Sequence, residues 1–155
     1  MTYAVVRIRG TVNINPDIKK TLNLLNLTRA NHCVLLEEKP SSKGMLNVVK
    51  DYVTWGDNLE KDVLTNLIKN RGRLIGDKKI TDEHIKSSTS YSNIEKLSEA
   101  IINNKFKYKE IPNVKPVIRL SPPKKGYKGI KRSFKKKGSL GYRGKEINKL
   151  LDRMI

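Results

Sequence analysis

The sequence predicts an α+β fold in which a small sheet carries helices on one face and is followed by a helical extension and a basic C-terminal loop and helix. In the first 56 residues, short β-branched runs alternate with amphipathic helical patterns in the order β-α-β-α-β. From residue 57 the pattern becomes helical. The positive charge is concentrated at the far end, because residues 105–155 hold 17 Lys or Arg against 3 acids in a chain of net charge +18.

The first strand is predicted at residues 3–10 (YAVVRIRG). Arg7 and Arg9 recur there at period two among apolar, β-branched residues, and Gly10 follows. This alternation predicts a strand with one buried face and one positive, solvent-exposed face.

A helix and a second strand follow. Residues 15–27 begin with Asn15 as a candidate N-cap and Pro16 at the first helical position, which together favour a helix start. Residues 31–38 (NHCVLLEE) form an apolar run that is closed by a Lys-Pro pair, so we expect a short strand.

The second helix and third strand complete the first unit. Residues 41–53 start with two serines and place Met45, Val48 and Val49 on one predicted face, and residues 53–55 (VTW) are β-like. Two helices in such a unit pack on one face of a small sheet.

The helical extension begins after Gly56. Residues 57–72 have Asp57 or Asn58 as a candidate cap and Gly72 as a stop. The shorter helices that follow are predicted at 81–88, capped by Thr81, and at 92–104, with Ile94, Leu97 and Ile101 pointing inward. The units expected are residues 1–56 (core), 57–116 (helical extension) and 117–155 (strand, basic loop and terminal helix).

The C-terminal third is the most unusual part of the chain. Residues 117–120 (VIRL) are β-like and precede a Pro-Pro pair, whereas residues 122–145 contain ten Lys or Arg, five Gly and no acid. Residues 145–155 form an amphipathic stripe of Ile147, Leu150, Leu151 and Met154. A terminal helix that docks on the body anchors the basic segment at both ends.

The basic segment predicts a nucleic-acid partner. Its charge density suits a phosphate track, and its glycines permit close backbone approach. A solvated tail is the alternative, which the apolar terminal helix disfavours. Tyr127, Phe134 and Tyr142 either stack on unpaired bases or pack on the protein body, and both remain open. The start of the second helix, Ser41 to Gly44, also suits a phosphate, although N-capping explains the serines equally well.

The sequence lacks the residue patterns that catalysis, cofactor binding or metal binding requires. No nucleophile with a base, no paired carboxylates and no phosphate-binding loop of the required spacing is recognisable, so we expect neither an enzyme nor a cofactor. Cys33 is the only cysteine and there are 2 histidines, too few for a zinc site, which predicts a buried structural thiol and no metal. Without an apolar run of about 20 residues or a signal peptide, we expect a cytoplasmic protein that contacts no membrane.

Five longer motifs together resemble the L30 family of large-subunit ribosomal proteins (uL30; bacterial L30, eukaryotic L7) in its archaeal form. They are YAVVRIRG (3–10), TLNLLNLTRANHCVL (21–35), GMLNVVKDYVTWG (44–56), RGRLIGDKKIT (71–81) and RLSPPKKGYKGIKRSFKKKGSLGYRG (119–144). The bacterial members are similar to the first 56 or so residues alone. Eukaryotic members have a basic extension before the first strand, where this chain begins, so we expect an archaeal member.

The resemblance implies a ferredoxin-like β-α-β-α-β core and a structural role in the large (50S) ribosomal subunit. It also implies large-subunit rRNA as partner, with 5S rRNA as a further candidate, and other 50S proteins as neighbours. The rival functions are an RNA-processing or RNA-modifying enzyme and a chromatin-type DNA-binding protein.

The expected RNA-binding residues come from the family motifs and from the charge pattern. Lys136 and Lys137 depart from relatives, which often have an acid or a glycine there. The expected residues are Arg7, Arg9, Arg29, His32, Lys43, Gly44, Arg119, Lys124, Lys125, Gly126, Tyr127, Lys128, Lys131, Arg132, Lys135, Lys136, Lys137 and Arg143.

Overall fold

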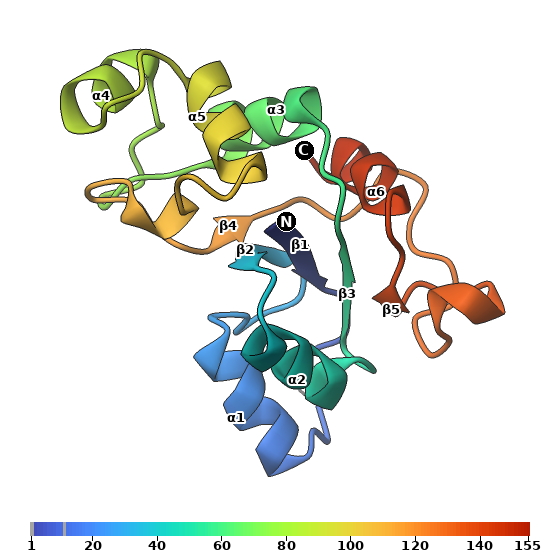
Figure 1. The fold of residues 1–155 in the computed structure, drawn as a ribbon. Helices are drawn as coiled ribbons and strands as arrows, with labels where there is room; N and C mark the ends of the chain where they lie inside the picture. The colour runs from blue at the N-terminus through green and yellow to red at the C-terminus, as the bar shows by residue number, and fades with distance from the viewer. Residues whose placement is uncertain (1, 11) are drawn as a thin grey trace.

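The computed structural model describes residues 2–10 and 12–155, which form a five-stranded sheet with helices against both faces (Figure 1). The strands are β1 (Thr2–Arg7), β2 (His32–Glu37), β3 (Val53–Gly56), β4 (Ile118–Arg119) and β5 (Gly141–Tyr142), in the spatial order β4-β2-β1-β3-β5. β1 is antiparallel to β2 and β3, β4 is antiparallel to β2, and β5 is parallel to β3. The helices are α1 (Pro16–Leu24), α2 (Pro40–Val49), α3 (Lys61–Arg71), α4 (Asp82–Ser88), α5 (Ile94–Ile102) and α6 (Glu146–Met154), with single 3-10 turns η1 (Tyr108–Glu110) and η2 (Phe134–Lys136). The predicted α+β class is confirmed.

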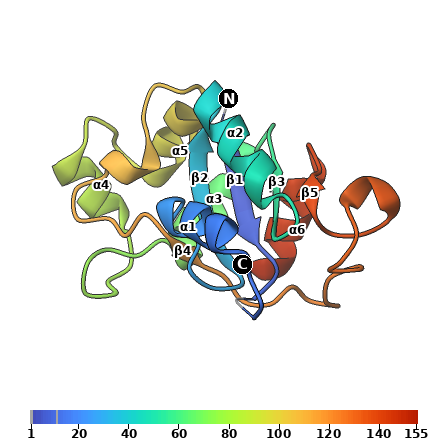
Figure 2. The same cartoon turned by 90° about the horizontal axis from the view of Figure 1, so that it is seen from below.

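α1 and α2 cover one face of the sheet, as expected (Figures 1 and 2). Leu22, Leu46 and Val49 are fully buried there in a cluster with the strands. Val48 was expected to point inward, but it is 48% exposed. Neighbouring residues on a helix differ by about 100°, so the inward position of Val49 turns Val48 towards solvent.

The starts of these two helices differ in their chemistry. Asn15 caps α1 as predicted, because its side chain accepts a hydrogen bond from the N–H of Asp17 at 2.9 Å. α2 begins at Pro40, and its N-cap is Lys39, which makes no side-chain cap bond. The serines that follow therefore lie inside the first turn and are not the N-cap.

The opposite face of the sheet is covered by α3, α5 and α6 (Figure 1). Leu64 and Leu67 of α3 pack there with Leu97 of α5 and Leu151 of α6, all fully buried. The four apolar residues predicted for the terminal helix are each at most 3% exposed, as are the three predicted to point inward from α5. Both predictions are confirmed.

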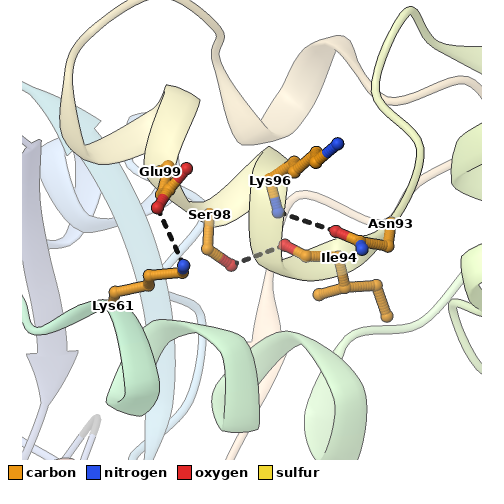
Figure 3. A network of polar contacts seen from close by, with 6 residues as sticks. All are labelled: Lys61, Asn93, Ile94, Lys96, Ser98 and Glu99. Atoms are coloured by element: carbon orange, nitrogen blue, oxygen red, sulfur yellow. Dashed lines mark hydrogen bonds and ion pairs between the residues drawn. The ribbon is translucent and has the colours of Figure 1, made fainter.

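α3 and α5 also meet through side chains at their surface (Figure 3). Lys61 Nζ lies 2.8 Å from Glu99 Oε1, and Asn93 caps α5 by accepting from the N–H of Lys96 at 2.9 Å. Because the ion pair is solvent-exposed, it contributes little to stability.

The start of α3 is capped from a distance. The helix begins at Lys61, so neither Asp57 nor Asn58 is its N-cap. Asn148 of α6 accepts a hydrogen bond from the N–H of Glu60 at 3.0 Å and donates to the carbonyl of Asn58 at 3.1 Å. The terminal helix thereby fixes the link between the first unit and the extension.

The C-terminal residues contribute to the same sheet. The strand predicted in VIRL is confirmed as β4, whereas β5 was not predicted. Gly56 and α6 approach so closely that a Cβ on Gly56 would lie 2.7 Å from the Cβ of Ile147. The division into residues 1–56, 57–116 and 117–155 stays a prediction.

Candidate nucleic-acid interface

The basic loop, defined here as residues 122–145, is attached to the body at both ends. At its start the N–H of Lys124 donates to the carbonyl of Arg153 at 3.0 Å, and Arg153 Nε donates back to the carbonyl of Lys124 at 3.0 Å. The same guanidinium also donates to the carbonyl of Gly126. At its end β5 pairs with β3, which confirms the prediction that the segment is anchored twice.

The middle of the basic loop folds back on itself. The N–H of Phe134 donates to the carbonyl of Leu140 at 2.7 Å, and the N–H of Ser139 donates to the carbonyl of Arg132 at 3.0 Å. Gly138, Ser139 and Leu140 are buried. The loop therefore has an interior of small and apolar residues, from which its long cationic side chains point outward.

Arg143 is part of this interior framework. It donates from Nε to Thr54 Oγ1 at 2.8 Å and from Nη2 to the carbonyl of Ser139 at 2.6 Å, and its guanidinium lies 5.0 Å from the ring centre of Phe134. Burial, followed by the nearby charge of Arg153, lowers the pKa of Arg143 to about 10. Arg143 thus joins the folded loop to β3.

Both tyrosines of the basic loop contact the protein. Tyr127 is half-buried, and its hydroxyl donates to Asn31 Oδ1 at 2.7 Å. Tyr142 is 44% exposed, and its hydroxyl donates to Asp57 at 2.9 Å. Of the two roles left open by the sequence, packing on the body describes Tyr127, whose pKa burial raises to about 12.

The outer surface of the basic loop is positively charged. Within residues 2–10 and 12–155, no salt bridge involves the exposed cations of this loop. Such uncompensated charge suits phosphate groups. The exposed cations are Lys124, Lys125, Lys128, Lys131, Arg132, Lys135, Lys136, Lys137 and Lys145.

A second basic group lies where β2 begins and β4 ends. His32 pairs in register with Arg119, and the side chains of Arg119 and Arg29 are exposed. Burial lowers the pKa of His32, and the charges of Arg119, Arg29 and Arg7 lower it further. The tyrosine bond described above places the start of the basic loop against this group, so both form one positive region.

Arg7 does not lie on a solvent-exposed face. It is 2% exposed, and its Nη1 and Nε donate to the carbonyls of Leu27 and Arg9 at 2.7 and 2.9 Å. Arg9 is half-buried, with its guanidinium 4.9 Å from the ring centre of Tyr52. The prediction of a solvent-exposed, positive face is therefore wrong, because β1 is a central strand that helices cover on both sides.

Lys43 and Gly44 lie apart from this region. They belong to α2, which follows the end of β2 opposite to His32. Lys43 Nζ pairs with Glu38 at 3.4 Å, and its N–H donates to the carbonyl of Lys39 within the helix. The structure therefore does not bring these two residues together with the other expected site residues.

The described part of the chain offers little for other chemistry. Among residues 2–10 and 12–155, no group of three or more His, Cys, Asp or Glu is arranged to hold a metal ion. Cys33 is fully buried, which raises the pKa of its thiol to about 12 and confirms a structural thiol. No helix in the same residues has the length and apolar content to cross a membrane.

Sequence reasoning did not identify Arg153 and Thr54, which hold the loop at its two ends. Arg153 is the basic residue in the last turn of α6, a position normally read as a favourable contact with the helix dipole. Thr54 stands in a β-branched strand, where its hydroxyl has no distinguishing pattern. Neither carries a local signal for a partner about thirty or ninety positions away.

Comparison with known proteins gives consistent matches. Residues 3–53 match the family model described as ribosomal protein L30p/L7e. The chain is 48% identical over 153 residues to the large ribosomal subunit protein uL30 of Methanosphaera stadtmanae. This match covers 99% of each of the two chains. It is 51% identical over 152 residues to the uL30 protein of Thermoplasma volcanium, covering 98% of this chain and 92% of that one.

Proposed function

This chain belongs to the L30p/L7e family of ribosomal proteins, and from this premise we propose that it is a structural component of the large (50S) ribosomal subunit that binds and stabilises rRNA. The relatives that match over nearly its whole length are named large ribosomal subunit proteins. Its partners are then large-subunit rRNA and other 50S proteins, and its role is not enzymatic.

The observation that carries this proposal is the exposed, unpaired charge of an anchored loop. Lys128, Lys131 and Arg132 project from one part of the basic loop, Lys135 and Lys136 belong to η2, and Lys137 follows it. Cations without acidic partners displace counterions from a phosphate backbone, which favours binding entropically. Because the loop is folded before binding, less conformational entropy is lost than for a flexible tail.

The expected site residues then divide by role. Arg29, Arg119 and the exposed cations of the basic loop contact phosphates. Tyr127 and Arg143 act indirectly, since their polar groups already bind the protein and hold the loop in place. Arg7 supports the fold, and Lys43 with Gly44 forms a separate contact beyond the far end of β2.

Recognition on this proposal depends on RNA shape and phosphate geometry more than on base sequence. The exposed groups are chiefly ammonium and guanidinium groups, which bind phosphate oxygens without distinguishing the bases. Both large-subunit rRNA and 5S rRNA present such phosphates, so we include 5S rRNA as a second partner to be tested.

The test is binding of the full chain to large-subunit rRNA transcripts, to 5S rRNA and to duplex DNA over a series of salt concentrations. If roughly 6 to 10 phosphates are engaged, affinity for the correct RNA falls by about a thousandfold or more between 50 and 200 mM salt. The proposal is contradicted by equal affinity for duplex DNA, or by an affinity for rRNA that does not change with the salt concentration. Retention on large subunits after a high-salt wash supports it.

A further inference from the structure

A groove lies on the opposite edge of the molecule from β5, beside β2. It encloses a cavity of about 330 Å³ between β2, the two helices α1 and α2, and the segment that carries η1. None of the residues expected to bind RNA lines it. The groove therefore lies apart from the basic loop, although Ser41 and Ser42 of its lining precede Lys43 and Gly44 in α2.

The floor of the groove is an open strand edge. β4 pairs only with His32 and Cys33, and the N–H of Leu120 donates to the carbonyl of Asn31. Because backbone groups alternate between the two edges of an antiparallel strand, the N–H and C=O of Leu35 and Glu37 point to the same outer edge. In residues 2–10 and 12–155 no backbone hydrogen bond reaches those outer groups from a neighbouring segment.

Pro116 explains why the chain's own strand stops before this edge. Continuing the β2–β4 register places Pro116 opposite Leu35, and proline has no N–H to donate to the carbonyl of Leu35. The chain then turns away, because the N–H of Lys115 donates to the carbonyl of Arg73 at 2.9 Å. Beyond Pro116 the edge of β2 borders the cavity.

The walls of the groove are apolar on both faces of the sheet. Leu36 and Met45 are half-buried on the α1–α2 side, and Leu35 and Phe106 are half-buried on the other side. Leu24, which also lines the groove, is 66% exposed and adds apolar surface to the α1–α2 side. Such walls accept apolar side chains that alternate along an added strand.

The rim of the groove is positive. Glu37 is neutralised by two lysines, with Lys39 Nζ at 3.1 Å and Lys107 Nζ at 3.2 Å from its carboxylate. Lys109 also lines the groove and is exposed. The groove lining thus holds three lysines and one carboxylate, which leaves a net positive rim that attracts an acidic residue near the apolar ones.

We propose that this groove binds a short extended segment of another protein, which adds a strand beside Leu35 to Glu37 and carries apolar side chains with an acidic residue next to them. The unpaired backbone groups supply directional hydrogen bonds, and the apolar walls and lysine rim select the side chains. A structured RNA fits less well, because its phosphates gain nothing from the apolar walls of the groove.

The first test places a photo-crosslinking phenylalanine derivative at Leu24 in the full chain, within assembled large subunits. The matched control is the same replacement at Ile75, which is also 66% exposed but lies in the turn between Arg73 and Lys79. The expected result is a crosslink from position 24, absent from position 75, to an apolar and acidic segment of another protein. A crosslink to rRNA alone, to a second copy of this chain, or to nothing overturns the proposal.

The second test measures amide hydrogen exchange at Leu35 and Glu37. In the subunit their exchange slows by roughly tenfold or more relative to the free chain, since each amide gains a strand hydrogen bond. Leu24→Glu removes this protection, Ile75→Glu does not, and both keep the salt-dependent rRNA binding of the free chain. Equal exchange in the two states overturns the groove proposal but leaves the rRNA proposal standing.

Discussion

The hydroxyl of Tyr127 donates a hydrogen bond to Oδ1 of Asn31 at 2.7 Å, although the two residues are 96 positions apart. Asn31 has a φ of 66° in the turn before β2, a left-handed conformation that asparagine tolerates better than most residues. The bond therefore joins the start of the basic loop to a turn of fixed shape beside Arg29 and His32. This pair of side chains thus links the position of the basic loop to that of the sheet.

Tyr127→Phe tests this link. The ring keeps its packing and only the hydroxyl is lost, so we expect the free energy of unfolding to fall by about 1 kcal/mol. Denaturant titration measures the change. Tyr91→Phe is the control, because no hydrogen bond within the described ranges involves the Tyr91 hydroxyl. Equal unfolding midpoints for both variants would show that the bond contributes nothing.

Charge reversal at Lys128, Lys131 and Arg132 tests the exposed charge directly. We expect binding to rRNA to weaken by orders of magnitude at low salt, while the unfolding transition stays where it is, because these side chains are exposed and lack acidic partners. Reversal of three exposed lysines of the helical extension, Lys69, Lys86 and Lys96, is the control. Similar losses in the two triple variants would indicate that net charge alone matters.

Local signals in the sequence predicted the structure where cause and effect are close together in the chain. Asn15 and Thr81 cap the helices that directly follow them, and both caps are present. The cap predicted for α3 is wrong, because the side chain that accepts a hydrogen bond from the N–H of Glu60 belongs to Asn148, 88 positions away. No periodicity over a short window contains that information.

The same distinction applies to the candidate site. The exposed lysines of the basic loop follow from composition, since a segment without acids and with many glycines has little reason to bury its charges. The buried role of Arg7 depends on β1 being the central strand, and that of Arg143 on the pairing of β5 with β3. Strand order is a long-range property that the sequence did not predict.

Arg7→Ala and Arg9→Ala separate a structural arginine from a surface one. Arg7 is buried and donates to the carbonyls of Leu27 and Arg9, so its truncation leaves a cavity and removes the donor from both acceptors. We expect a loss of about 2–4 kcal/mol in the free energy of unfolding. Arg9→Ala removes a surface contact with Tyr52 and costs about 1 kcal/mol or less. Equal losses in urea titrations would contradict the assignment.

His32 gives the stability of the protein a defined pH dependence. Its pKa lies below the ordinary value of 6.5, so between those two values the unfolded chain binds more protons than the folded one. The free energy of unfolding is therefore highest above about pH 6.5 and falls as the pH decreases through the histidine range. Urea midpoints from pH 7.5 to 5.5 measure the slope, which His32→Gln reduces. A slope unchanged by His32→Gln would contradict the prediction.

Gly138→Ala tests whether the folded shape of the basic loop matters, because it alters no charge. A Cβ at Gly138 would lie 2.5 Å from the Cβ of Arg132 and closer still to its carbonyl group, so the turn must open. At Gly129 the nearest atom to a new Cβ is 3.6 Å away, an ordinary contact, which makes Gly129→Ala the matched control. We expect Gly138→Ala to weaken rRNA binding about tenfold, the equivalent of about 1.4 kcal/mol, with little change in the unfolding of the body. Equal affinity of the two variants would mean that the cations bind RNA as a flexible tail.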